Sequence, residues 1–166
     1  MVAIVVEIDS KEALDALRQA SKQIGNTRLL MENLGEALLN TTLERMDREE
    51  APDGQKWQRL NSAYAASKRS NKILQEQGMA SGLKGSLHYA ISGNELRLGS
   101  DKVYAAIHQF GGEIKPVNGD YLTFKMGGGF VKARKVTIPA RPYLGVGPHE
   151  EQAIINVAKD LLNAAF

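Results

Sequence analysis

The 166-residue sequence contains no cysteine, which excludes disulfide bonds, thiolate metal sites and a cysteine nucleophile. Aromatic residues make up only 6% of the chain and include one tryptophan, so we expect no large aromatic binding cleft. No apolar run approaches the roughly 20 residues of a membrane-spanning helix, and we predict no membrane contact. The apolar opening MVAIVVEI has no basic flank and reaches Glu7 too early for a secretory signal peptide.

Residue patterns that carry chemistry are also scarce. The three histidines, His88, His108 and His149, lie far apart, and none has a second histidine or a carboxylate at the helical spacing of a metal-binding pair. The GGGF stretch lacks the lysine of a phosphate-binding loop, and no GxSxG nucleophile motif occurs. We therefore predict a protein that is not an enzyme and holds no metal or cofactor. A hydrolase without a local motif is the alternative left open.

Positive and negative charges are distributed unevenly, although the net charge is only +2. Acids dominate between Glu36 and Glu50, and bases dominate between Lys115 and Arg141. This polarity suits head-to-tail contact between copies, or a basic surface that faces a polyanion. Two separately solvated faces are the simpler alternative, because most charge runs mean no more than that.

The N-terminal half predicts mainly helices. The β-branched residues 2–8 are typical of a strand, and a capped helix is expected at 11–24. A second helix is expected at about 27–50, because leucines and methionines recur there with a period of 3.6 residues. A short helix is expected after Asn61, and the polar, small residues at 70–85 predict a flexible loop.

The C-terminal half predicts hairpins and a last helix. SLHYAIS and ELRLGS alternate apolar and polar residues around a Gly93–Asn94 turn, and DYLTFKM and FVKARKVTIP do so around three glycines. Residues 149–166 carry apolar side chains at helical spacing. The predicted fold is therefore a single α+β domain, residues 1–166, in which N-terminal helices and a C-terminal helix pack against an antiparallel sheet of hairpins.

The stretch VYAAIHQFGG contains one of the histidines and ends at a double glycine. Helical spacing places Tyr104, Ile107 and Phe110 on one side, which we expect to face inward, and Gly111 permits a left-handed backbone at the helix end. His108 would then lie at the rim. The segment is interpreted as a structural plug and turn, not as an active site.

The stretch IPARPYLG, residues 138–145, contains two prolines that keep the backbone extended and remove two hydrogen-bond donors. One interpretation is a rigid connection between a strand and the last helix. The other is a preorganised docking edge that displays Arg141 and Tyr143 to a partner, since interfaces favour both residue types. Both interpretations stay open on sequence alone.

Three segments, in the order APDGQKWQRLNSAYAASK, VYAAIHQFGG and FVKARKVTIPARPYLG, make the sequence resemble the virion morphogenesis, or tail-completion, proteins of Mu-like tailed bacteriophages. The resemblance covers about residues 28–162. It implies a non-enzymatic neck, tail-completion or tail-terminator protein of the head–tail joint, assembled in the host cytoplasm. Such a protein forms a ring, with a hexamer favoured, around the channel through which DNA leaves. The implied partners are other neck, connector and tail-tube proteins.

The resemblance and the charge pattern together nominate two sets of residues. The expected subunit or partner interface consists of Tyr104, His108, Phe110, Arg141, Tyr143 and Leu144. The expected lining of the DNA channel consists of Lys125, Lys132, Arg134 and Lys135. Such bases would hold phosphates through charge without reading sequence, although strand alternation puts Lys135 on the face opposite Lys132 and Arg134. The alternative function is a small nucleic-acid-binding module that uses this basic hairpin.

Overall fold

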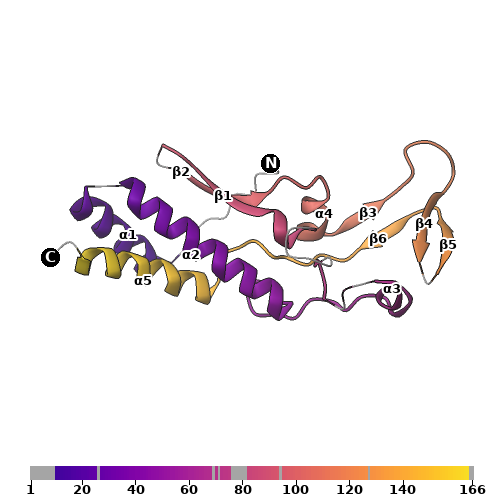
Figure 1. Cartoon of the computed structure of the whole chain (residues 1–166), viewed down its shortest axis with the longest axis horizontal. Coiled ribbons are helices and arrows are strands. Elements are labelled where there is room, and N and C mark those ends of the chain that lie inside the picture. Colours follow the sequence, from indigo (N-terminus) through magenta and orange to yellow (C-terminus); the bar gives the residue numbers. More distant parts are fainter. Residues whose placement is uncertain are drawn as a thin grey trace.

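The computed structural model is elongated, with its long helices and one β hairpin at one end and further β strands at the other (Figure 1). The residues that it describes are 10–25, 27–68, 70, 72–75, 82–93, 95–126 and 128–164. The strand predicted at 2–8 lies outside them. Along the chain, helices are followed by hairpins and then by a final helix, which confirms the predicted α+β class.

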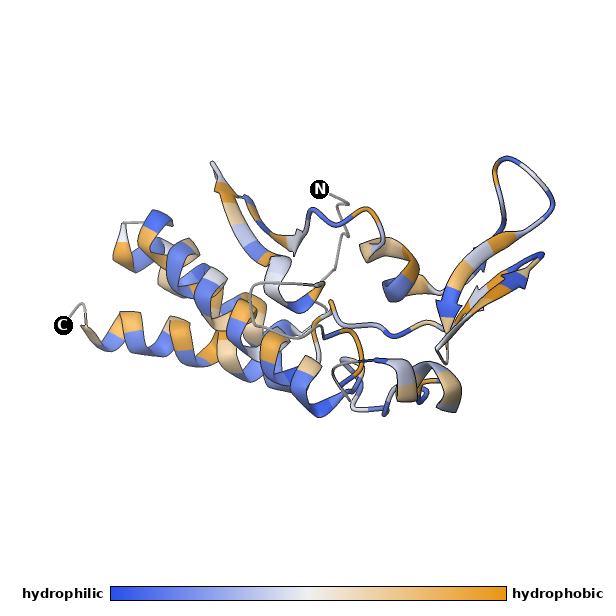
Figure 2. Ribbon diagram, turned by 45° about the vertical axis from the view of Figure 1, so that its right-hand side comes forward, coloured by the Kyte–Doolittle hydropathy of each residue, from blue (hydrophilic) through white to orange (hydrophobic). Residues whose placement is uncertain are grey.

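Three helices form one end of the molecule: α1 (Lys11–Ile24), α2 (Thr27–Arg48) and α5 (Pro148–Ala164). The Ser10 side chain caps α1 by accepting a hydrogen bond from the Ala13 amide. In Figure 2 apolar and polar residues alternate along these helices, as burial on one side requires. The core between the helices consists of Ala13, Ala20, Leu30, Leu34, Ile154, Ile155 and Ala158.

The hairpin of β1 (Leu87–Ser92) and β2 (Glu95–Ser100) lies on α2. Its strands pair antiparallel, with Tyr89 opposite Leu98. The Tyr89 ring rests on α2 at Gly35, where an added Cβ atom would lie only 2.4 Å from a ring carbon. Glycine is needed at this helical position because the ring packs so closely against the backbone.

A second core joins the helices to the hairpins. The short helix α3 (Ser62–Ser67) is capped by the Asn61 side chain, a 3₁₀ turn at Lys84–Ser86 leads into β1, and α4 (Ala105–Phe110) follows β2. The buried side chains of this core are Met46, Trp57, Ile73, Leu83, Leu87, Ala105, Tyr143 and Leu144. Elements from both halves of the sequence therefore share one interior.

Part of the loop predicted at 70–85 belongs to the second core. Ile73 and Leu83 are both buried there. Residues 71 and 76–81 of the same segment lie outside the described part of the chain. Where it is described, the segment is therefore packed against its neighbours.

Two small antiparallel sheets form the other end of the molecule (Figure 1). β3 (Gly112–Ile114) pairs with β6 (Val136–Ile138), and β4 (Leu122–Met126) pairs with β5 (Gly129–Ala133). The strand predicted at 130–139 is thus divided between β5 and β6, which have different partners. Among the described residues the strands form three separate two-stranded sheets. Because β5 does not continue into the β3–β6 sheet, the β4–β5 hairpin projects away from the long helices (Figure 1).

Candidate functional site

The segment 139–147, which contains the two prolines, connects β6 to α5 through the middle of the molecule. The Trp57 indole donates a hydrogen bond to the Pro142 carbonyl at 2.9 Å, and the Arg45 guanidinium donates to the Tyr143 carbonyl at 2.8 Å. The Tyr143 side chain is fully buried, and burial raises the pKa of its hydroxyl to about 12. Of the two interpretations of IPARPYLG, the structure supports the rigid connection.

Gln109 of α4 holds the end of this segment in place. Its side-chain oxygen accepts hydrogen bonds from the Tyr143 and Leu144 amides, both at 3.0 Å, and its amide group donates to the Leu144 carbonyl at 2.8 Å. Gln109 is itself buried. Sequence reasoning on VYAAIHQFGG singles out His108 and misses Gln109, because a glutamine in a short helix gives no sign of partners 34 and 35 residues away.

A buried ion pair ties α2 to α5 beside this segment. Arg45 pairs with Glu150, and the two side chains are only 3% and 2% exposed. Glu150 also accepts a hydrogen bond from the Gly147 amide at 3.0 Å. Burial lowers the pKa of Arg45, and the Glu150 carboxylate opposes this shift. The two charges compensate each other and join helices that are far apart in the sequence.

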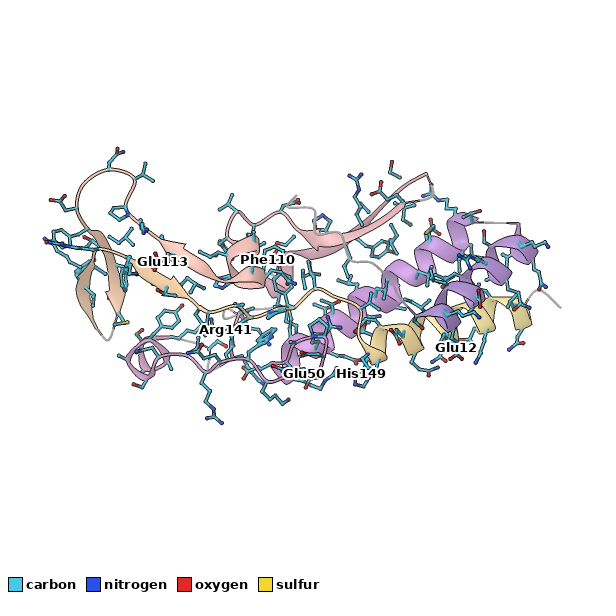
Figure 3. All side chains as sticks on the ribbon, turned by 180° about the vertical axis from the view of Figure 1, so that it is seen from behind. Glu12, Glu50, Phe110, Glu113, Arg141 and His149 are labelled. Atoms are coloured by element: carbon cyan, nitrogen blue, oxygen red, sulfur yellow. The ribbon has the colours of Figure 1, made fainter. Side chains whose placement is uncertain are left out.

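Half of the residues expected at a partner interface lie inside this chain. Arg141, Tyr143 and Leu144 are all buried, and Figure 3 shows Arg141 in the middle of the molecule. The Arg141 guanidinium donates to the Gln58 carbonyl at 3.1 Å, and burial lowers its pKa. The expectation that these three side chains are displayed on the surface is wrong, because each one completes contacts in the core.

The other half of the expected interface lies at the surface of α4. Val103 and Phe110 are 93% and 64% exposed, and Tyr104 is exposed too. The prediction that Tyr104 and Phe110 face inward is wrong, because Ala105 and Gln109, four residues apart on one helix face, form the buried side of α4. We call the exposed residues Val103, Tyr104 and Phe110, together with the half-buried His108 beside them, the α4 surface.

His108 lies half-buried at the edge of the α4 surface. Its ring makes an edge-to-face contact with the Tyr104 ring, with 5.8 Å between the ring centroids. The buried Nδ1 atom has no hydrogen-bond partner among the residues described. Burial lowers the pKa of His108, and the nearby Arg141 charge lowers it further. A neutral imidazole at physiological pH follows, which suits a packing role.

The β4–β5 hairpin gathers three of the four predicted channel residues on one face. Lys125 stands directly opposite Phe130, and Lys132 lies two residues further along on the same side. Phe130 is 80% exposed. At the base of the hairpin the Arg134 guanidinium lies over the Tyr121 ring, 5.8 Å from the ring centroid. We call this set the hairpin face: Tyr121, Lys125, Phe130, Lys132 and Arg134.

The fourth predicted channel residue, Lys135, is separate from the hairpin face. It pairs with Glu113 of β3 at 2.6 Å, and Lys115 pairs with the same carboxylate at 3.3 Å. The hydrogen bonds from these lysines lower the pKa of Glu113. Lys135 is thus an ion-paired residue beside the hairpin and does not share its row of cations.

The acidic run at the end of α2 is largely neutralised within the chain. The internal ion pairs are Glu44–Arg48, Asp47–Lys84, Glu50–Arg48 and Glu50–Lys56. Hydrogen bonds from their cationic partners lower the pKa values of Asp47 and Glu50. These acids therefore fasten the following segments of the chain to α2, and they are not left free to attract the basic hairpin of a neighbouring copy.

The described residues also include an apolar groove of about 840 Å³, which lies on α2 between α1 and β2. Leu30, Leu34 and Leu38 contribute to it from α2, and Leu96 and Leu98 from β2. In this part of the chain no three histidine, aspartate or glutamate side chains gather in a way that could hold a metal ion. No helix described here has the length and apolar content to cross a membrane.

The sequence matches the model of the phage virion morphogenesis family over residues 8–163. The chain belongs to this family, and its role is structural or in the assembly of a phage particle. The resemblance inferred from the three sequence segments is confirmed.

The relatives of the chain come from phage Mu and from Mu-like prophages. Over 161 residues the chain is 29% identical to the "Putative capsid assembly protein G" of Escherichia phage Mu, across 93% of this chain and 88% of that protein. Over 117 residues it is 33% identical to the Mu-like prophage FluMu G protein 1 of Haemophilus influenzae, across 66% of this chain and 64% of that protein. No solved structure shows a significant match.

Proposed function

We propose that the protein is a structural component of the head–tail joint, a neck, tail-completion or tail-terminator protein that acts by association and not by catalysis. Family membership over nearly the whole chain supports a role in building the particle. The phage Mu relative is named "Putative capsid assembly protein G", and this name also describes a role in building the particle. In this proposal the protein is assembled in the host cytoplasm and retained in the virion.

The α4 surface is the observation that carries this proposal. Val103, Tyr104 and Phe110 expose apolar area within one short stretch of chain, and apolar side chains that gather in this way mark contact sites. Gln109 anchors α4 to the core segment beneath it. A surface that is already rigid loses little conformational entropy when a partner binds.

The partner expected at the α4 surface is a second copy, placed head to tail. Contact between two different surfaces of identical chains closes into a ring when the rotation permits it, and the family resemblance favours a hexamer. The α4 surface lies between the two ends of the elongated molecule, so a copy bound there leaves both ends for other contacts (Figure 1). The remaining surfaces would then meet neck, connector and tail-tube proteins.

Replacing Phe110 by aspartate should weaken self-association by at least about tenfold, because a carboxylate would lose its water in an apolar contact. Light scattering coupled to size-exclusion chromatography, over a range of concentrations, measures the change. Val117→Asp is the matched control, since Val117 is 96% exposed in the loop between β3 and β4. Equal effects at the two positions would contradict an interface at the α4 surface.

Phage particles assembled without this protein test its place in the virion. A role at the joint predicts filled heads beside separate, complete tails, because each part is built but the two cannot connect. Tails of excessive length would indicate instead that the protein terminates tail growth. Electron microscopy of lysates distinguishes these results, and normal virions made without the protein would refute the proposal.

A further inference from the structure

The hairpin face combines unpaired positive charge with exposed aromatic rings. Lys115 and Lys135 nearby are both paired with Glu113, but none of the three cations of the hairpin face pairs with an acid in the described part of the chain. Phe130 lies directly opposite Lys125 and two residues before Lys132 on the same side of the hairpin, and it is 80% exposed. This combination indicates a negatively charged partner that also offers apolar surface.

We propose that the hairpin face binds the sugar–phosphate backbone of duplex DNA without reading its base sequence. Lys132 of β5 and Lys125 of β4 lie on the same side of the hairpin, and Arg134 follows directly after β5 at the base of the hairpin, over the Tyr121 ring. The cations can therefore meet several phosphates together. The Tyr121 ring holds the Arg134 guanidinium in position before the phosphate arrives.

Phe130 explains why DNA fits this face better than an acidic protein surface does. When the flanking lysines hold phosphates, the ring reaches the sugars and base edges between them, where apolar side chains such as phenylalanine are known to insert. An acidic protein surface could also pair with the lysines, but it offers no regular alternation of phosphates and sugars to a row of cations with a ring beside them. The charge and the ring together therefore favour a nucleic acid.

The inference that the hairpin face binds DNA rests on the proposed function only for the arrangement of several copies around one channel. In a ring, several hairpin faces would surround one channel, so that weak contacts from each copy act together. Binding by an isolated copy does not require head–tail joining. Failure to bind DNA would leave the role in assembly intact, and failure of that role would leave DNA binding intact.

Fluorescence anisotropy with a short DNA duplex, between about 50 and about 200 mM salt, tests the site. Three phosphate contacts predict that the logarithm of the association constant falls with the logarithm of the salt concentration with a slope of about −2.7. The variant K125Q/K132Q/R134Q should bring the slope close to zero and weaken binding at least about tenfold at the lowest salt. Phe130→Ser should weaken binding at every salt concentration without changing the slope.

The matched control is K11Q/K22Q/K159Q, which removes three exposed lysines from α1 and α5 and so changes the net charge equally. It should bind DNA like the wild type, and equal losses in the two triple variants would overturn the site in favour of net charge alone. Displacement of DNA by polyglutamate at equal charge concentration would overturn the proposal in favour of an acidic protein partner. All substituted side chains are exposed, so thermal unfolding should stay unchanged.

Discussion

The Glu150→Ala variant is expected to be less stable than the wild-type protein by about 3–5 kcal/mol. Glu150 is the buried partner of Arg45, so its removal leaves an arginine charge in the interior without a counter-charge. The Gly147 amide loses its hydrogen-bond acceptor as well. Since a typical protein is stable by only about 5–15 kcal/mol, this variant should lie close to unfolding at room temperature.

Urea unfolding followed by circular dichroism measures this loss of stability. Glu151, in the same helical turn but partly exposed, provides the control, and Glu151→Ala should cost less than about 1 kcal/mol. The double variant Arg45→Met, Glu150→Leu removes both charges and should be more stable than Glu150→Ala alone. If it is not, the hydrogen bonds lost at the Tyr143 carbonyl and the Gly147 amide outweigh the buried charge as the cause of the instability.

The Gln109→Leu variant is expected to lose at least about 3 kcal/mol of stability, since each buried backbone group left without a partner costs about 1–3 kcal/mol. Leucine matches glutamine in size but has no polar atom. Three backbone groups lose their partner together: the Tyr143 amide, the Leu144 amide and the Leu144 carbonyl. The core segment and α4 should loosen together, because Gln109 makes three of the hydrogen bonds that join them.

Urea unfolding and amide hydrogen exchange test this expectation. Exchange at Tyr143 and Leu144 should become faster in Gln109→Leu, because both amides lose the oxygen that protects them. Gln152→Leu is the control: Gln152 is exposed on α5 and bonds to Asn156, so its replacement should change stability by no more than about 0.5 kcal/mol. Unchanged stability and exchange in Gln109→Leu would contradict its role as an anchor.

Local sequence patterns suffice to place most of the helices and strands. The helix at 11–24 and the hairpin of β1 and β2 are predicted with nearly the observed bounds, because caps, turns and apolar periods depend on neighbouring residues. The division of 130–139 into β5 and β6 could not be predicted in this way. It depends on pairing with β3, which comes from a different part of the chain.

Local sequence patterns predict the contacts of the candidate site less well than they predict its helices and strands. Residue type suggests that Tyr143 and Arg141 contact a partner and gives no sign of a role for Gln109, whereas the structure buries all three. A buried arginine or glutamine is stable only where the fold supplies partners, and these partners include the Gln58 carbonyl and the backbone of Leu144. No local pattern reveals such contacts.

The amino-acid sequence by itself determined the α+β class, the family resemblance and the presence of a basic hairpin, because each of these follows from residue order within short segments. The tertiary structure alone decided which charges are free. It pairs Asp47 with Lys84, 37 residues later. It also gathers Lys125, Lys132 and Arg134 on one face of a hairpin, where none of them pairs with an acid of the described residues. The reason is physical: a charge is neutralised by whatever group the fold brings within a few ångströms, at any separation in sequence.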